Sequence, residues 1–315
     1  MVGGYTLDDL RIRKPQKKDI PSVEEGIHLF ISYDLVNSTK LKTLCLSSEW
    51  QDLIGQFYKR AENMASNPLE ARIWKYIGDE VIVYKIISDR ETLCETVNNA
   101  SIALKELGTF VRNWESKSVI RRNLLSVKCA AWCALINNSS QEANRCMILQ
   151  TSVLDALGRR SEQYIPDFIG PDIDIGFRIA KYADRGRMIL SSDLALLVLK
   201  CAGTSENKSR QEEYCLSTTQ KMKIVSFKQL KGVWHDRHYP IIWYEKSWLD
   251  IGDSFEYDEP HSSDVIKGLH EAKDGLPIEI SALTKVYEDI GAPDKVNVMT
   301  EMLQRKSQQR ISENP

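Results

Sequence analysis

Two aspartates, Asp34 and Asp79, follow short apolar segments that are typical of strands in a sheet. Asp34 closes the apolar run 27–34, and Asp79 lies in a Gly-Asp turn between two further runs, 71–77 and 81–87. Magnesium prefers hard oxygen ligands and commonly takes one or two carboxylates together with phosphate oxygens of a substrate. Acids on neighbouring strands could hold two ions roughly 3.5–4 Å apart, the arrangement used for in-line phosphoryl chemistry. Each acid also has a structural interpretation, Asp79 as a turn residue and Asp34 as a helix-entry residue.

A third segment, residues 167–178, carries several acids, a turn and an arginine that leads into a helix. Asp174 and Arg178 are four residues apart and therefore share one face of that helix. A surface ion pair would explain the spacing and would contribute little stability. The functional interpretation is an arginine directed at phosphate, for which its planar fork is suited.

The elements that must position these residues follow from the hydrophobic pattern. Residues 137–165 predict a loop with a helical piece near 152–157. The order of strands and helices indicates an α+β or α/β sandwich in which helices cover a mixed sheet. The pattern predicts helices over 47–64, 91–114, 172–183 and 193–200, and strands over 27–34, 71–77, 81–87, 124–136, 187–190, 222–227 and 239–245.

Composition divides the chain into three parts. Residues 1–25 form a polar N-terminal arm, residues 26–247 form one domain, and residues 248–315 form a C-terminal appendage that is first acidic and then weakly amphipathic. We expect the last ten or so residues to be disordered.

Several classes of function are excluded by charge and hydropathy. The net charge of −2 gives no reason to expect wholesale binding of nucleic acid. No apolar run is long enough to span a bilayer, and the N-terminus lacks the apolar core of a secretory signal, so a cytoplasmic location is expected. The seven cysteines are scattered without a CxxC pair, which indicates free thiols and no zinc site or disulfide framework.

Taken together, the motifs resemble the catalytic domain of class III nucleotide cyclases. The match runs in order from about residue 27 to residue 245. The resemblance implies an α+β, class III cyclase-like sandwich with a mixed central sheet covered by helices, and it makes residues 26–247 a nucleotide cyclase catalytic domain. The segments that carry it are YDLVNST at 33–39, KYIGDE at 75–80, DFIGPDIDIGFR at 167–178, GRMILS at 186–191 and LKG at 230–232.

The resemblance implies a metal site and an assembly. Asp34 and Asp79 would bind two Mg²⁺ or Mn²⁺ ions per site, with the Leu35 carbonyl as a further candidate ligand. In this family the metal acids and the residues that read the base come from two facing domains. One catalytic domain per chain therefore implies a homodimer with composite active sites.

The resemblance also assigns the substrate contacts. Lys75 and Asp167 occupy the positions that read the base of a nucleoside triphosphate. Asp174 occupies the ribose position, and Arg178 the position that neutralises the transition-state phosphate. Lys231 occupies a position that contacts the triphosphate.

Some residues depart from the family pattern near the base. Asp174 stands where asparagine is usual, and Phe177 stands where a small residue is usual, while Trp74, Tyr76 and Phe168 flank the base-reading positions. Aromatic bulk suits a smaller base, so the chain is similar to the pyrimidine cyclases of bacterial Pycsar antiphage systems. We therefore expect conversion of UTP or CTP to cyclic UMP or cyclic CMP, as the signal-producing step of an antiphage defence system.

Two alternatives stay open at this point. Lys75 with Asp167 is also the adenine-reading pair of adenylate cyclases, so the product could be cyclic AMP. A catalytically inactive cyclase homologue that only binds nucleotide is the second alternative, although retention of both metal acids and of Arg178 argues against it.

Overall fold

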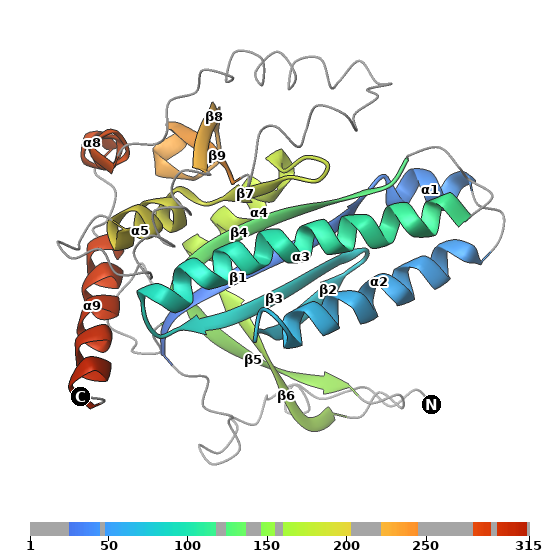
Figure 1. Ribbon diagram of the computed structural model, residues 1–315, viewed down its shortest axis with the longest axis horizontal. Coiled ribbons are helices and arrows are strands. Elements are labelled where there is room, and N and C mark those ends of the chain that lie inside the picture. Colours follow the sequence, from blue (N-terminus) through green and yellow to red (C-terminus); the bar gives the residue numbers. More distant parts are fainter. Residues whose placement is uncertain are drawn as a thin grey trace, which may run out of the picture.

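The computed structural model describes residues 25–44, 48–117, 124–136, 146–154, 160–202, 222–244, 280–290 and 295–313. Its centre is a seven-stranded sheet in the order β2-β3-β1-β4-β7-β9-β8 (Figure 1). Within the described strands, β4 and β7 form the one parallel pair of this sheet, so it is mixed. The strands are β1 (Gly26–Val36), β2 (Arg72–Ile77), β3 (Glu80–Ile87), β4 (Ser126–Ile136), β7 (Met188–Leu190), β8 (Met222–Gln229) and β9 (His238–Tyr244).

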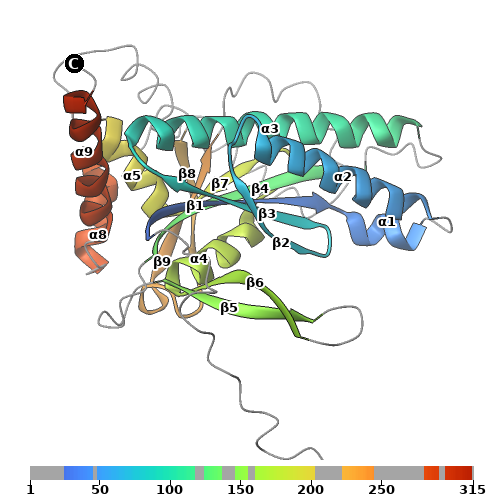
Figure 2. The ribbon, with the colours of Figure 1, turned by 90° about the horizontal axis from the view of Figure 1, so that it is seen from below.

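Helices cover the sheet in layers (Figure 2). On one face lie α2 (Glu49–Ser66) and α3 (Arg90–Lys117), with α1 (Ser38–Leu44) leading into them. The opposite face carries α4 (Pro171–Ile179) and a separate hairpin of β5 (Met147–Leu154) and β6 (Arg160–Ile169). At one end of the sheet, α8 (Ile280–Ile290) and α9 (Lys295–Glu313) stand beside α5 (Ser192–Ala202).

Alternation along β1 decides which residues face which layer. Leu29, Ile31 and Tyr33 belong to the core cluster that includes α2 and α3. Phe30 belongs to the second cluster, on the side of α4 and the β5–β6 hairpin. Since successive side chains of a strand point to opposite faces, Asp34 lies on the α4 face of the sheet.

Most of the predicted elements are confirmed, including the β2–β3 hairpin with Asp79 in its turn. The prediction of a loop with a helical piece was wrong for residues 147–154 and 160–165, because β5 and β6 form an antiparallel hairpin there. Residues 137–145 and 155–159 of that prediction lie outside the described residues. This hairpin pairs only with itself, and its sequence mixes polar residues with Pro166, so no regular alternation marks it. Asp34 does not end its strand either, since β1 continues to Val36.

The predicted C-terminal appendage contributes to the main core. Leu283 of α8 and Met299 and Leu303 of α9 are fully buried in the cluster that contains α3 and α5. Helix α9 continues to Glu313, where disorder was expected. The predicted arm and the acidic stretch after residue 248 fall on residues 1–24 and 245–279, which lie outside the described residues.

Two further expectations concern the thiols and the membrane. Five cysteines of the described residues are buried, as expected of packed thiols: Cys94, Cys129, Cys133, Cys146 and Cys201. Cys45 and Cys215 lie outside the described residues. Across the described part of the chain, no helix combines the length and apolar character that a bilayer span needs.

Candidate active site

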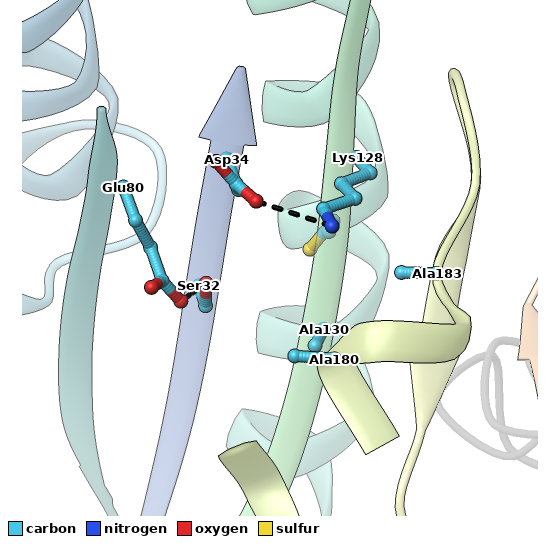
Figure 3. Close-up of a pocket in the computed structure, with 8 residues that line it drawn as sticks. Ser32, Asp34, Glu80, Lys128, Ala130, Ala180 and Ala183 are labelled. Carbon is cyan, nitrogen blue, oxygen red and sulfur yellow. Dashed lines mark hydrogen bonds and ion pairs between the residues drawn. The ribbon is translucent and has the colours of Figure 1, made fainter. Parts of the chain in front are cut away.

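Asp34 lies between two charged residues of the neighbouring strands. The β-sheet register places Lys128 of β4 opposite Asp34 on one side and Glu80 of β3 opposite it on the other. The Lys128 Nζ atom lies 3.2 Å from the Asp34 Oδ2 atom, and the Ser32 hydroxyl donates a hydrogen bond to the Glu80 carboxylate (Figure 3). Two acids and one lysine therefore meet on three adjacent strands.

Asp79 adds a third carboxylate to this group, which we call the acidic edge (Asp34, Asp79 and Glu80). Burial is the main cause that raises the pKa of Asp34; Lys128 opposes it, and the charge of Asp79 raises it further. Burial also raises the pKa of Glu80, against the hydrogen bond from Ser32. The strand register pairs Asp34 with Glu80, the residue that follows Asp79, so these carboxylates gather at the ends of β1 and β3.

The acidic edge fits a magnesium or manganese ion by its chemistry. Its oxygens are hard donors, and one or two carboxylates complete an Mg²⁺ site when substrate phosphates supply the other oxygens. No group of three His, Cys, Asp or Glu in the described part of the chain is arranged to hold a metal by itself. Any ion at this edge would therefore share its coordination with a substrate or with water.

The hollow beside the acidic edge is small. Ala180 and Ala183, in the short turn that follows α4, line it together with Ser32 and Lys128 (Figure 3). Its volume is about 10 Å³, which is room for about one water molecule. A nucleotide would have to extend from this hollow into space outside it.

Lys75 and Asp167 form a second charged group. The Lys75 Nζ atom on β2 lies 2.6 Å from the Asp167 Oδ1 atom on β6, and each side chain is about one-third exposed (32% and 35%). The ammonium also lies 4.1 Å from the centroid of the Trp74 ring. The β5–β6 hairpin, missed from the sequence, is thus the element that brings Asp167 to Lys75.

The aromatic residues that flank this pair separate into two environments. Trp74 and Phe168 are buried and pack edge to face, with centroids 5.2 Å apart. Phe177, half-buried on α4, lies against Trp74 at 6.1 Å. Tyr76 faces away and packs against Tyr58, with ring centroids 4.5 Å apart and the rings tilted by 38°. Trp74 and Phe177 therefore form an aromatic wall, whereas Tyr76 belongs to the hairpin surface.

Helix α4 presents Asp174 and Arg178. Asp174 is exposed and Arg178 is half-buried, and neither side chain forms a hydrogen bond or ion pair with another described residue. On the inner face of the helix, a Cβ atom added at Gly176 would lie 2.2 Å from the Trp132 ring. Glycine is thus required for α4 to approach β4 this closely, and Arg178 remains available to a ligand.

Two predicted residues lie apart from these groups. Lys231 is exposed in the turn between β8 and β9, where Gly232 has a φ of 71°. The side chain of Leu35 is buried in the core on the opposite face of β1, so only its backbone carbonyl could serve as a ligand.

Sequence reasoning missed Glu80 and Lys128. Glu80 directly follows Asp79, and Lys128 is a charged residue inside the apolar run 124–136. A lysine within a buried strand usually has a partner, because an unpaired buried charge is costly. That signal could have pointed to the strand neighbour of Asp34.

The fold has counterparts among solved structures, although no protein-family model and no curated protein matches the chain. The adenylyl cyclase CyaB from P. aeruginosa aligns with a TM-score of 0.50 at 12% identity, over 73% of this chain and 98% of that one. The guanylyl cyclase Cya2 aligns with a TM-score of 0.44 at 13% identity, over 70% and 93%. The guanylate cyclase domain of RhGC from Catenaria anguillulae, in complex with GTP, aligns with a TM-score of 0.44 at 9% identity, over 70% and 96%. The likeness to CyaB establishes the class III cyclase fold for the mixed seven-stranded sheet and its helices.

Proposed function

We propose that this chain is a metal-dependent nucleotide cyclase that converts UTP or CTP to cyclic UMP or cyclic CMP and pyrophosphate. The observation that carries the proposal is the strand register that pairs Asp34 with Glu80, directly after Asp79, and so gathers these carboxylates at the ends of β1 and β3 in a cyclase-like sheet. Such a pair suits a divalent cation whose remaining coordination positions are filled by oxygens of a triphosphate.

In the proposed reaction the ribose 3′-oxygen attacks the α-phosphorus, the hydroxyl proton is lost, and pyrophosphate leaves. Asp34 and Asp79 would hold two Mg²⁺ or Mn²⁺ ions per site, with the Leu35 carbonyl as a further ligand. The chemistry that bound ions supply is activation of the 3′-hydroxyl and neutralisation of the triphosphate charge. Arg178 would stabilise the charge on the reacting phosphate, and Lys231 would bind the triphosphate.

We further propose a homodimer with composite sites. The hollow at the acidic edge holds about one water molecule, so the rest of a nucleotide must be bound by other surfaces. Arg178 and Asp174 have no partner among the described residues of their own chain, as expected of groups that serve a facing subunit. Each site would combine the metal acids of one chain with Arg178 and the base-reading residues of the other.

The base is read, in this proposal, by Lys75 and Asp167, with Asp174 at the ribose. Phe177 and Trp74 build a bulky wall close to that pair, which favours a small base. Burial of Trp74 and Phe168 in the core limits how far this wall can move. A rigid, narrow site discriminates by shape and by hydrogen-bond partners.

Cyclic AMP is the second candidate product. The intact Lys75–Asp167 ion pair is the observation that favours it, since the same pair reads adenine in adenylate cyclases. CyaB, whose fold this chain shares, is itself an adenylyl cyclase.

The experiment is a competition among ATP, GTP, CTP and UTP with Mn²⁺, followed by separation of the products. We expect cyclic UMP or cyclic CMP to dominate. Dominant cyclic AMP would replace the pyrimidine proposal with the adenylate one. If no nucleotide gives a cyclic product, the chain is a catalytically inactive homologue that only binds nucleotide.

The biological role that we propose is production of a second messenger in an antiphage defence system, within the cytoplasm where the triphosphates are found. The support is the resemblance to Pycsar cyclases. Cells that carry the chain should accumulate the cyclic pyrimidine after phage infection, and cells carrying Asp79→Ala should not.

A further inference from the structure

Three helices begin at one buried point. Asp172 is the second residue of α4, Asp193 is the second residue of α5, and Lys295 is the first residue of α9. The Lys295 Nζ atom lies 2.7 Å from the Asp193 Oδ2 atom and also contacts the Asp172 carboxylate. The two aspartates are only 5% and 2% exposed. We call Asp172, Asp193 and Lys295 the latch.

The position of Lys295 is unfavourable for its own helix. A cation at a helix N-terminus opposes the helix dipole, and the first turn of α9 carries no acid to offset it. The two aspartates, in contrast, lie in first turns where negative charge is favoured. The lysine is therefore explained by the acids that it bridges and not by the helix that it begins.

The two acids depend on Lys295 to different degrees. Asp193 has a further partner, because the Tyr287 hydroxyl of α8 donates a hydrogen bond of 2.6 Å to its Oδ1 atom. Asp172 has Lys295 and the Cys146 thiol. Loss of the lysine would leave Asp172 as the less satisfied buried charge.

Asp172 lies on the helix that carries the proposed substrate contacts. Helix α4 spans only nine residues, and Asp174 and Arg178 follow Asp172 within it. The helix is held at one point by Gly176 against Trp132 and at its start by the latch. Helix α5 carries none of the proposed site residues, so Asp193 fixes Lys295 without bearing the site.

We propose that Lys295 is a positioning residue, which holds α4 through Asp172 so that Arg178 and Asp174 reach the substrate correctly. The C-terminal helices α8 and α9 are then part of the catalytic unit. This inference rests on the proposed cyclase function for its activity readout.

The test compares variants of the full chain: Lys295→Met, Lys295→Arg, Asp172→Asn, Asp193→Asn and the double variant Lys295→Met/Asp172→Asn. Lys285→Met, at an exposed lysine of α8, is the matched control. For each we would measure kcat, KM and Tm, with assays well below the Tm of the least stable variant. Hydrogen exchange of a peptide covering residues 171–182 supplies a readout that needs no activity.

We expect Lys295→Met and Asp172→Asn to lower kcat by about tenfold or more, because a small displacement of a catalytic group has effects of this order. KM should change much less, and Lys295→Arg should recover part of kcat. The double variant should be little worse than the worse single variant, since both act through one contact. Asp193→Asn should lower Tm by several degrees with kcat near that of the wild type, and Lys285→Met should match the wild type.

Equal loss of kcat in Asp193→Asn and Asp172→Asn would overturn the inference, because the latch would then act only through overall stability. Wild-type kcat in Lys295→Met would overturn it as well. If Lys295→Met does not fold, the comparison of Asp172→Asn with Asp193→Asn decides alone. If the wild type makes no cyclic product, the proposed function fails, and faster exchange of α4 in Asp172→Asn than in Asp193→Asn still decides the positioning role.

Discussion

The acidic edge and the latch are built from the same residue types and differ in how their charges are satisfied. The edge combines three carboxylates with two lysines: Lys128 pairs with Asp34, and the Nζ atom of Lys42 in α1 lies 3.5 Å from the Asp79 Oδ1 atom. These groups remain partly exposed; Asp34 and Asp79 are 30% and 21% exposed. The latch joins two buried carboxylates to a lysine that contacts both, with a tyrosine hydroxyl in addition. Each group has one more carboxylate than lysines, but the edge keeps its charges partly exposed beside a hollow, whereas the latch buries its carboxylates and adds the Tyr287 hydroxyl as a donor. Lysine next to aspartate thus belongs to the proposed metal site in one region and to a buried joint between helices in the other, and the degree of burial distinguishes the two.

The largest effect expected from this comparison is loss of activity at the edge without loss of the fold. Asp34→Ala and Asp79→Ala should each lower turnover by at least about a hundredfold, since metal-held charge stabilisation contributes several kcal/mol. Circular dichroism and Tm should stay near wild type. Glu95→Ala, at an exposed acid of α3, is the matched control for removing a carboxylate. Near-normal turnover of either edge variant at saturating Mn²⁺ would contradict the metal assignment.

A second prediction tests whether each active site takes the acidic edge from one chain and Arg178 of α4 from the other chain. Asp34→Ala and Arg178→Ala homodimers should both be inactive, because every composite site in them is damaged. After subunit exchange, about half the dimers are mixed, each with one intact site of two, so activity should approach roughly a quarter of wild type under closed two-fold pairing. Exchange must be verified with tagged chains. If verified exchange restores nothing, all catalytic groups belong to one chain, and the composite site must be abandoned.

A third prediction addresses the other anchor of α4. Gly176→Ala places a methyl group against the Trp132 ring, so we expect a loss of about 1–3 kcal/mol in the free energy of unfolding, as in overpacked cores. Turnover should fall with it, because Arg178 follows on the same helix. Gly55→Ala in α2 is the matched control: nothing lies within 4 Å of its added Cβ, so it should stabilise by about 0.5–1 kcal/mol. Equal stability of the two variants by urea denaturation would show that α4 can move away from β4.

Much of the fold was predictable from the sequence because its elements are strongly periodic. The run 27–34 and the β2–β3 turn predicted the positions of Asp34 and Asp79 on neighbouring strands, and the structure brings them together. The β5–β6 hairpin was not predictable, since it lies outside the main sheet and carries no clear alternation. The contact between Asp172 and Lys295 could not be predicted for a different reason. Lys295 lies more than a hundred residues away, in a segment whose composition indicated a separate appendage. Local pattern predicts elements, whereas such contacts depend on the packing of distant helices.

The smallest expected effect concerns stability at the edge, where burial makes the ionised form of Asp34 less favourable in the folded protein. The pKa of Asp34 is raised in the folded protein, mainly by burial, so its ionised form is less favourable folded than unfolded. Folding stability should therefore rise as the pH falls through that raised pKa, which is the opposite of a carboxylate held by a strong ion pair. In the presence of a chelator, Asp34→Asn should match or exceed the wild-type Tm at neutral pH, although it loses the contact with Lys128. The advantage should shrink as the pH is lowered, because the wild-type carboxyl then becomes neutral as well.

Added Mn²⁺ should raise the Tm of the wild type by mass action and leave that of Asp34→Asn almost unchanged. Scanning fluorimetry over a pH series measures all three effects, and Asp193→Asn supplies the contrast, since it should be less stable than the wild type throughout the neutral range. A lower Tm for Asp34→Asn than for the wild type without metal would mean that the pair with Lys128 outweighs the repulsion, and the edge would then resemble the latch.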